Sequence, residues 1–243
     1  MISPRVYKRF YPDTRRSGTL FFYAWMQRSL AAPYRALNLG AGPGDSPESE
    51  LFRIRDMRRS GGTVEGCDPD PIVVNNVQID RAVVMEDPNV IPFENGTMDI
   101  VYSDYVLEHV ECPEAFLREV YRVLKPGGSF MFRTPNSWHY VSIAARLTPQ
   151  WVHLLVANKV RGLGKEAHEP YRTWHRMNSR RTIEGLFAAV GFRRLELVMF
   201  EGEPSYLMFS NVAFVAGGVY ERIVNAFPRL AGLRANIIGR GLK

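Results

Sequence analysis

Short apolar runs alternate with segments of helical spacing along most of the chain. The apolar runs are rich in β-branched residues and predict strands at Ala36–Leu39, Thr63–Cys67, Arg81–Val84, Met98–Ser103 and Ser129–Arg133. The segments between them predict helices near Glu48–Arg59, Pro71–Gln78 and Pro113–Leu124. Alternating strands and helices favour parallel pairing with right-handed crossovers, and nearly continuous apolar strands suit a sheet covered on both faces. The pattern therefore predicts an α/β fold.

The two ends of the chain depart from this alternation. The first residues, to about Leu30, predict a helix with a mostly apolar face. After Arg133 an aromatic-rich stretch precedes a helix expected over Ser179–Val190 and a strand expected over Arg194–Phe200. We expect the last strand over Arg234–Arg240.

The first predicted strand runs into a loop with glycine at Gly40, Gly42 and Gly44. Glycine lacks a Cβ and tolerates positive φ, so a ligand can lie directly against the backbone of such a loop. The loop is not the dinucleotide fingerprint, which needs glycine where this chain has Asp45. Taken alone, the three glycines fit a plain tight turn equally well.

An acidic residue, Asp68, ends the second predicted strand and is followed by Pro69. A carboxylate at this place can accept hydrogen bonds from both ribose hydroxyls of a nucleoside. The alternative is a helix N-cap or an Asx turn. Lys125-Pro126-Gly127-Gly128 predicts the end of a helix, with Lys125 in its last turn.

Composition bounds the class of protein. The 243 residues, 46% of them apolar, suffice for one core, and the pattern predicts neither a membrane-spanning segment nor a signal peptide. Cys67 and Cys112 form no metal-like or redox pair, so we expect no metal and a cytoplasmic protein. The net charge of +6 fits solvated helix faces or attraction to an anionic partner. The uncharged stretch Pro204–Tyr220 predicts core or cavity wall, with a membrane surface or a dimer contact as alternatives.

With these residues in view, the chain resembles the class I S-adenosylmethionine-dependent methyltransferases, most closely the small-molecule group called methyltransferase type 11. The resemblance covers roughly residues 35–136. It rests on the order and spacing of several motifs: Leu37 to Gly44, Gly66-Cys67-Asp68-Pro69, Asp87 before Ile91-Pro92-Phe93, Met98 to Val101, Val106-Leu107-Glu108-His109-Val110, and Arg122 to Gly128.

The resemblance implies a Rossmann-like, doubly wound sheet of about seven strands, mostly parallel with the last strand antiparallel. It implies one domain over residues 1–243, with an N-terminal helical lid (1–34), a cofactor-binding core (35–136), a substrate-side insertion (137–178) and C-terminal helices and strands (179–243). The implied cofactor is S-adenosyl-L-methionine. Its expected binding residues are Gly40, Ala41, Gly42, Gly44, Asp68, Pro69, Glu86, Asp87, Ser103 and Asp104.

Three departures from the family pattern qualify these roles. Asn38 stands where the family usually has an acidic residue. Pro88 has no N–H, so a family hydrogen bond to the adenine ring cannot form there, and Glu86 shares or replaces the role of Asp87. The loop from Gly44 to the next helix is longer than usual, which leaves the contact to the methionine carboxylate open.

Methyl transfer from a sulfonium is an in-line displacement, and the protein mainly holds donor and acceptor in position. A general base is needed only where the acceptor must lose a proton. His109 is the candidate base, with simple packing as the alternative. The expected lining of the acceptor pocket is His139, Tyr140, Tyr171 and His175.

We therefore expect a methyltransferase that acts on an O, N or C atom of a small, partly apolar or lipid-like acceptor. The chain lacks the turns that nucleic-acid methyltransferases use and a nucleic-acid module, so nucleic acid is not the expected partner. Peripheral contact with a membrane is compatible with the uncharged stretch. The alternative function is a non-catalytic relative that binds the cofactor or its demethylated product as a regulatory subunit. A nicotinamide-dependent oxidoreductase is disfavoured by Asp45.

Overall fold

The computed structural model describes residues 2–11, 17–147 and 172–243. They divide into two compact units. Unit 1 gathers Met1–Gly18, Pro135–Arg172 and Met199–Asn236, and unit 2 gathers Thr19–Thr134, Thr173–Val198 and Ile237–Lys243. The expectation of a single domain stays a prediction.

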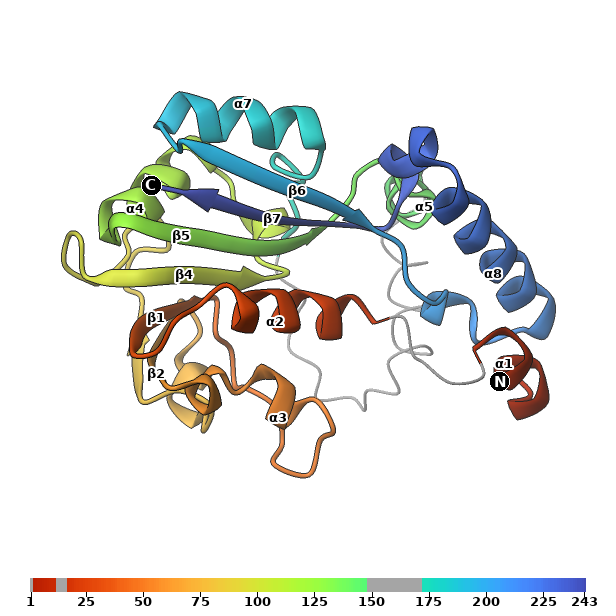
Figure 1. Cartoon of the computed structure of the whole chain (residues 1–243), viewed down its shortest axis with the longest axis horizontal. Coiled ribbons are helices and arrows are strands. Elements are labelled where there is room, and N and C mark those ends of the chain that lie inside the picture. Colours follow the sequence, from red (N-terminus) through yellow and green to blue (C-terminus); the bar gives the residue numbers. More distant parts are fainter. Residues whose placement is uncertain (1, 12–16, 148–171) are drawn as a thin grey trace. The chain divides into compact units, whose positions relative to one another are not determined.

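A seven-stranded sheet organises unit 2 within the described residues (Figure 1). Its strands are β1 (Tyr34–Leu39), β2 (Gly62–Asp68), β3 (Arg81–Val84), β4 (Met98–Asp104), β5 (Leu124–Pro135), β6 (Arg194–Phe200) and β7 (Asn236–Leu242). They lie in the order β3-β2-β1-β4-β5-β7-β6, with six strands parallel and one antiparallel. The predicted fold class is confirmed.

The strand order reverses beside β1, and this places the site. β1 pairs in parallel with β2, with Leu39 opposite Cys67, and with β4, with Asn38 opposite Tyr102. The carboxyl ends of the three strands therefore lie at one edge of the sheet. In open α/β sheets ligands bind in the crevice beside this kind of reversal.

Helices and 3₁₀ turns flank the sheet of unit 2. They are α2 (Gly18–Arg28), α3 (Phe52–Arg55), α4 (Pro113–Val123) and α7 (Arg180–Val190), with the 3₁₀ turns η1 (Met57–Ser60), η2 (Pro71–Asn75) and η3 (Leu107–His109). Of these, α2, α4 and α7 bury apolar side chains. α4 buries Phe116, Leu117, Val120 and Val123 at helical spacing. Phe187 of α7 stacks on Phe130 of β5, with the ring centroids 6.0 Å apart.

Several predicted helices are shorter than the sequence pattern suggested. The N-terminal helix is two helices, and the segment 48–59 forms only α3 and η1, because the Asp56 carboxylate accepts a hydrogen bond from the Arg58 N–H and starts a new turn. η2 begins at Pro71 and replaces the helix expected to Gln78.

The prediction that Lys125 lies in the last turn of the helix is wrong. α4 ends at Val123, and Lys125 precedes Pro126, which disfavours helical backbone at position 125. Instead, Lys125 Nζ donates to the Asp99 carboxylate of β4 at 2.8 Å. The last strand, expected to begin at Arg234, begins at Asn236.

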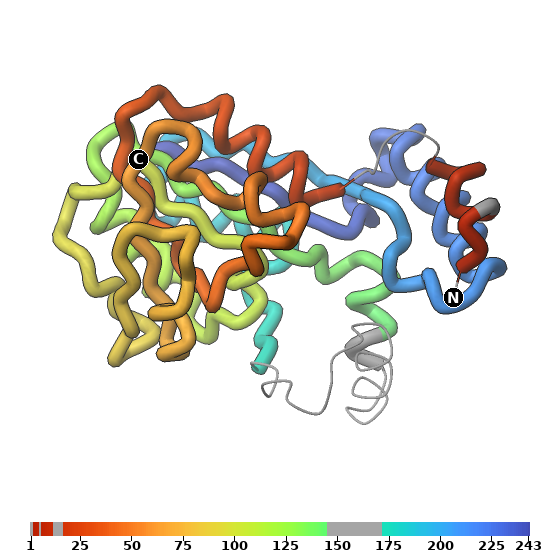
Figure 2. Tube along the Cα trace, turned by 90° about the horizontal axis from the view of Figure 1, so that it is seen from below, coloured from red at the N-terminus to blue at the C-terminus, as the bar shows by residue number. Residues whose placement is uncertain are grey.

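Unit 1 contains α1 (Pro4–Phe10), α5 (Tyr140–Leu147), α8 (Asn211–Ala226) and the 3₁₀ turns η4 (Ser205–Leu207) and η5 (Pro228–Leu233). α1 packs against α8, as both views show (Figure 2). Three aromatic rings of this N-terminal segment, those of Tyr7, Phe10 and Tyr11, surround the buried Phe214 of α8, with centroid distances of 5.8 to 6.2 Å. Gly218 permits this approach, because a Cβ there would lie 2.8 Å from the Phe10 ring.

The Arg122 guanidinium fastens the loop that follows β3, and this generates a stability prediction. It donates to the carbonyls of Ile91 and Phe93, each at 2.8 Å, and to Glu119 at 2.7 Å. Lysine cannot reproduce this fork of donors. We expect Arg122→Lys to lower the free energy of unfolding by about 1–3 kcal/mol, measured by urea denaturation. Arg118→Lys, on the same helix but in an exposed pair with Glu114, should change it by under about 0.5 kcal/mol. Equal effects of the two substitutions would contradict this account.

Candidate functional site

The loop after β1 folds back against the end of β2. The N–H groups of Gly40 and Ala41 donate to the Cys67 carbonyl at 2.8 and 3.2 Å, and the Gly42 N–H donates to Asp68 Oδ2 at 3.0 Å. Gly40 and Gly42 have φ of +75° and +51°, where other residues are strained. A Cβ at Gly40 would overlap Val106, whereas a Cβ at Gly42 would enter open space. The loop therefore presents bare backbone to its surroundings.

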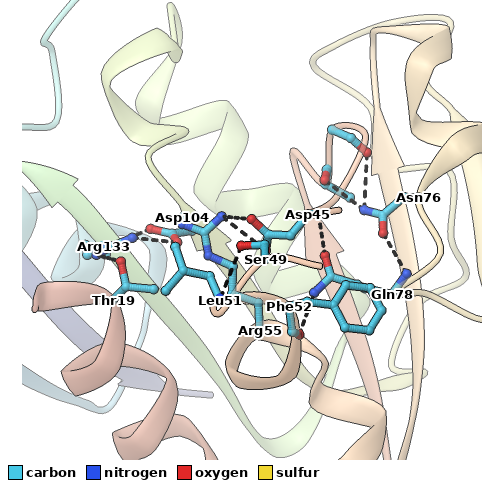
Figure 3. Close-up of polar contacts among 12 residues, drawn as sticks. Thr19, Asp45, Ser49, Leu51, Phe52, Arg55, Asn76, Gln78, Asp104 and Arg133 are labelled. Carbon is cyan, nitrogen blue, oxygen red and sulfur yellow. Dashed lines mark hydrogen bonds and ion pairs between the residues drawn. The ribbon is translucent and has the colours of Figure 1, made fainter. Parts of the chain in front are cut away.

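Two amides from the connection between β2 and β3 hold this loop in place (Figure 3). Asn76 Nδ2 donates to the carbonyls of Ala41 and Gly42 at 3.0 and 3.2 Å. Gln78 Oε1 accepts from the Asp45 N–H at 2.7 Å, and Gln78 Nε2 donates to the Phe52 carbonyl at 2.9 Å. Both amides are buried, so water competes little for these bonds.

A cavity of about 220 Å³ opens beside this loop. Its lining combines the loop after β1 with an amide from β1 and with charged and aromatic side chains from β4, α2 and α3. The lining residues are Tyr23, Asn38, Gly40, Ala41, Gly44, Asp45, Arg55, Asn76, Gln78, Tyr102, Asp104 and Tyr105. All belong to unit 2.

Arg55 and Asp45 form an ion pair in the wall of the cavity. Arg55 Nη1 lies 3.2 Å from Asp45 Oδ1, and the guanidinium carbon lies 6.0 Å from the centroid of the Tyr23 ring. Arg55 Nε is buried and has no hydrogen-bond partner among the residues that the structure describes. A buried donor without a partner is costly, so a ligand oxygen that reaches it would stabilise the site.

A second ion pair fixes Asp104 at the end of β4. Arg133 Nε and Nη2 donate to the two Asp104 oxygens at 2.6 and 2.7 Å, and Arg133 Nη1 donates to Thr19 Oγ1 at 2.8 Å (Figure 3). The Arg133 side chain is only 3% exposed and lies 4.5 Å from the centroid of the Tyr105 ring. Tyr105 has φ of +59°, an uncommon conformation that points to a local functional constraint.

The structure brings some of the predicted cofactor residues together at this cavity. Gly40, Ala41, Gly44 and Asp104 line it. Asp68 is buried at the end of β2, next to Pro69, and its Oδ1 accepts from the Asp70 N–H at 2.9 Å. Asp68 lines no part of this cavity, and the same holds for Gly42, Glu86, Asp87 and Ser103.

These other residues lie close to the same sheet edge. Glu86 and Asp87 are exposed and follow β3, whose last residue, Val84, pairs with Asp68. Asp87 Oδ1 accepts from the Asn89 N–H at 2.8 Å. Ser103 of β4 is fully buried, and its hydroxyl has no hydrogen-bond partner in the described part of the chain.

The residues predicted for catalysis and the acceptor pocket are distributed over both units. His109 ends η3 and is half-buried, and His175 also belongs to unit 2, where its N–H donates to the Glu108 carbonyl at 3.1 Å. His139 and Tyr140 belong to unit 1; their rings lie 4.1 Å apart, and His139 Nε2 lies 3.5 Å from Glu201. Tyr171 lies outside the described residues.

The sequence did not predict several residues that line or support the cavity but belong to no known motif. They include Tyr23, Arg55, Asn76, Gln78, Tyr102, Tyr105 and Arg133. Arg133 carried a usable signal, because a charged residue inside an otherwise apolar strand needs a buried partner. The others carried none, since their roles depend on contacts across the fold.

Comparison with known proteins identifies the family. A methyltransferase domain family model matches residues 7–197, which is most of the chain. The chain belongs to this methyltransferase family. The predicted resemblance is confirmed, and S-adenosylmethionine is the methyl donor of the family.

Individual relatives are similar to only part of the chain. The chain is 33% identical over 137 residues to the ubiquinone biosynthesis O-methyltransferase of Xanthomonas oryzae, covering 49% of this chain and 54% of the relative. It is 38% identical over 85 residues to the thiol S-methyltransferase TMT1A of Homo sapiens, covering 33% of this chain and 34% of the relative. The chain thus spans between about a third and about half of the length of these two curated relatives.

A solved structure shows the same fold. It is the geranyl diphosphate C-methyltransferase of Streptomyces coelicolor, in complex with Mg²⁺, geranyl diphosphate and S-adenosyl-L-homocysteine. The TM-score is 0.58 at 17% identity, covering 92% of this chain and 77% of that one. In the part of the chain that the structure describes, every helix is too short or too polar to cross a bilayer.

Glu108 generates a pH prediction. Its carboxyl is buried beside Thr134, whose hydroxyl donates to it at 3.2 Å, and burial raises the pKa of Glu108 from 4.5 to about 7. The folded state therefore holds the proton more tightly than the unfolded state. The resulting loss of stability is absent below pH 4.5, grows as the pH rises, and is complete above about pH 7.

We expect Glu108→Gln to keep the bond from Thr134 and to raise the free energy of unfolding above pH 7 by up to about 3 kcal/mol, with little effect near pH 4.5. Urea denaturation across this pH range measures the effect. Glu111→Gln, an exposed neighbour, should show no such pH-dependent gain. A constant difference between Glu108→Gln and the wild type at every pH would refute the assignment.

Proposed function

We propose that this chain transfers a methyl group from S-adenosylmethionine to a small, partly apolar or lipid-like acceptor, at an O, N or C atom. The observation that carries this proposal is the bare backbone of Gly40–Gly42 beside a cavity that holds Arg55 and Asp104. The bound cofactor would supply a methyl group that is activated by the positive sulfonium. The chain's own residues then have to hold donor and acceptor in line and keep water out.

Each end of the cofactor has proposed partners. The Gly40–Gly42 backbone would lie against the methionine portion. Asp68 would accept from the ribose hydroxyls, because each of its oxygens accepts a single backbone bond and retains a lone pair. Glu86 and Asp87, exposed at the end of β3, would accept from the adenine amine.

The sequence left open which residue binds the carboxylate of the cofactor's methionine portion, and we propose Arg55 for this contact. Arg55 Nε has no partner among the described residues, and Arg55 Nη1 already lies at the cavity beside Asp45. We assign Arg55 to the α-carboxylate of the cofactor's methionine portion, because a guanidinium binds a carboxylate in a two-pronged geometry. Asp104, held by Arg133, would face the sulfonium side of the same portion.

The proposed acceptor class draws its support from the names of the relatives. These names refer to thiols, to a sterol and to ubiquinone biosynthesis, and one solved neighbour holds geranyl diphosphate. Among these, a sterol and a geranyl chain are largely apolar. We propose His109 as the base where the acceptor must lose a proton, and His175 of the same unit as an acceptor contact. The expected acceptor contacts of His139, Tyr140 and Tyr171 stay predictions from the sequence.

Asp68 tests the proposed function. We expect Asp68→Ala to weaken binding of S-adenosylmethionine roughly ten- to hundredfold in calorimetric titrations, because a charged hydrogen-bond acceptor is lost. Asp70→Ala, two residues further on, should bind within about threefold of the wild type. Incubating the wild type with methyl-labelled cofactor and pools of apolar acceptors should label a product at catalytic turnover. Cofactor binding without any labelled acceptor would leave only a binding protein, and unchanged affinity in Asp68→Ala would remove the assigned site.

Arg55 gives a test of orientation within the cavity. We expect Arg55→Met to weaken S-adenosylhomocysteine about tenfold and to leave 5′-methylthioadenosine unchanged, since the latter lacks the amino-acid portion. Arg53→Met, exposed on the same short helix, serves as the matched control. If Arg55→Met weakened both ligands equally, the arginine would support the fold of the site rather than bind the carboxylate.

A further inference from the structure

The helix α8 of unit 1 is apolar on its exposed face as well as on its buried face. Its buried face carries Phe214 and Val224. Its outer stripe, which we define as Val212, Val219 and Ile223, is 80%, 47% and 45% exposed. The spacing of seven and four residues places the three side chains on one side of the helix. An exposed apolar side of a helix is a surface on which a partner can bind.

The outer stripe is continued by further exposed apolar side chains of the same unit. Phe227 follows the end of α8 and is 59% exposed, and Phe209 and Tyr206 precede its start with 57% and 54% exposed. These side chains add exposed apolar groups on both sides of α8 in the sequence, and a large exposed apolar patch marks an interaction site.

The charged residues of unit 1 indicate which kind of partner binds the outer stripe. The described residues of unit 1 hold eight Lys and Arg residues but only three acidic residues, Glu201, Glu203 and Glu221. The described part of unit 1 is therefore basic. Among its described residues, Lys8, Arg9, Arg222 and Arg229 are exposed.

The described carboxylates of unit 1 are withdrawn from this surface. Glu201 and Glu221 are buried, where they accept from the Ala235 N–H and from Asn225 Nδ2, each at 2.7 Å. Glu203 is half-buried and accepts from the Tyr7 hydroxyl at 2.6 Å. Arg222, at the edge of the stripe, stacks on Phe10 at 4.4 Å and stays exposed. The exposed charged side chains among the described residues of unit 1 are thus all basic.

We propose that unit 1 docks on an anionic lipid bilayer through the outer stripe of α8. Apolar side chains on one side of a helix enter the boundary between head groups and acyl chains, and neighbouring cations bind anionic head groups. α8 lies on the membrane rather than crossing it, in keeping with its 16 residues and its buried Glu221. This docking is independent of the proposed methyl transfer and needs neither cofactor nor acceptor.

The test is flotation of the full chain with vesicles of phosphatidylcholine alone and of phosphatidylcholine mixed with phosphatidylglycerol. We expect binding to the mixed vesicles that falls as salt is raised, because exposed charges are screened. The double variant Val212→Glu with Val219→Glu should lower the partition coefficient by about tenfold or more. Both positions are exposed and helical, so folding should persist, which far-ultraviolet circular dichroism checks.

A matched control uses the same substitution elsewhere. Val74→Glu with Val77→Glu changes two valines of unit 2 that are 63% and 54% exposed, and it adds the same negative charge. Binding that falls equally in both double variants would reflect net charge alone and would overturn the proposal. Absence of binding by the wild type to the mixed vesicles would also overturn it. So would sedimentation showing that the stripe holds two copies together in place of binding vesicles.

Discussion

The site depends on one constraint: the glycine loop after β1 is held in place by side chains that come from β2 and from the connection after it. Glycine loses the most conformational freedom on folding, so a loop with Gly40, Gly42 and Gly44 is costly to order. Asp68 and Asn76 offset this cost through bonds to the N–H of Gly42 and to the carbonyls of Ala41 and Gly42. The loop is thus ordered before a ligand arrives, and binding does not have to supply that ordering free energy.

The same logic applies to the acidic group at the end of β4. Asp104 is held on both oxygens by Arg133, and that arginine lies in the buried stretch of β5. Replacing such a buried pair by apolar residues is often neutral for the stability of a protein. The pair is therefore better explained by the orientation that it gives Asp104 than by a contribution to stability. It fixes a carboxylate at the cavity wall while neutralising most of the field that a lone acid would create. Glu108, four residues further on, forms no ion pair of this kind with any described residue, and burial raises its pKa.

The sequence was most informative where the chain's local pattern decides the structure. The strands follow from apolar runs, and β3 begins and ends at the predicted residues, Arg81 and Val84. Helices near Pro and Asp were overestimated, because side-chain bonds such as that of Asp56 to the Arg58 N–H favour short 3₁₀ turns. Asn76, Gln78 and Arg55 were not predictable, since each acts through partners 10 to 35 residues away along the chain. The motif residues are those proposed to bind the cofactor, and these distant residues determine the shape of the loop and the cavity around it.

The two units divide the surface properties of the chain between them. The sheet and cavity of unit 2 present carboxylates and backbone groups, which suits a charged, water-soluble cofactor. Unit 1 presents apolar and basic groups, which suit a bilayer. An apolar acceptor partitions into membrane and is scarce in water, so an enzyme held at the membrane meets a much higher local concentration of it. The two proposals thus remain separable by experiment. If the acceptor is lipid-like, however, the basic residues of unit 1 would hold the enzyme at the membrane in which its acceptor is dissolved.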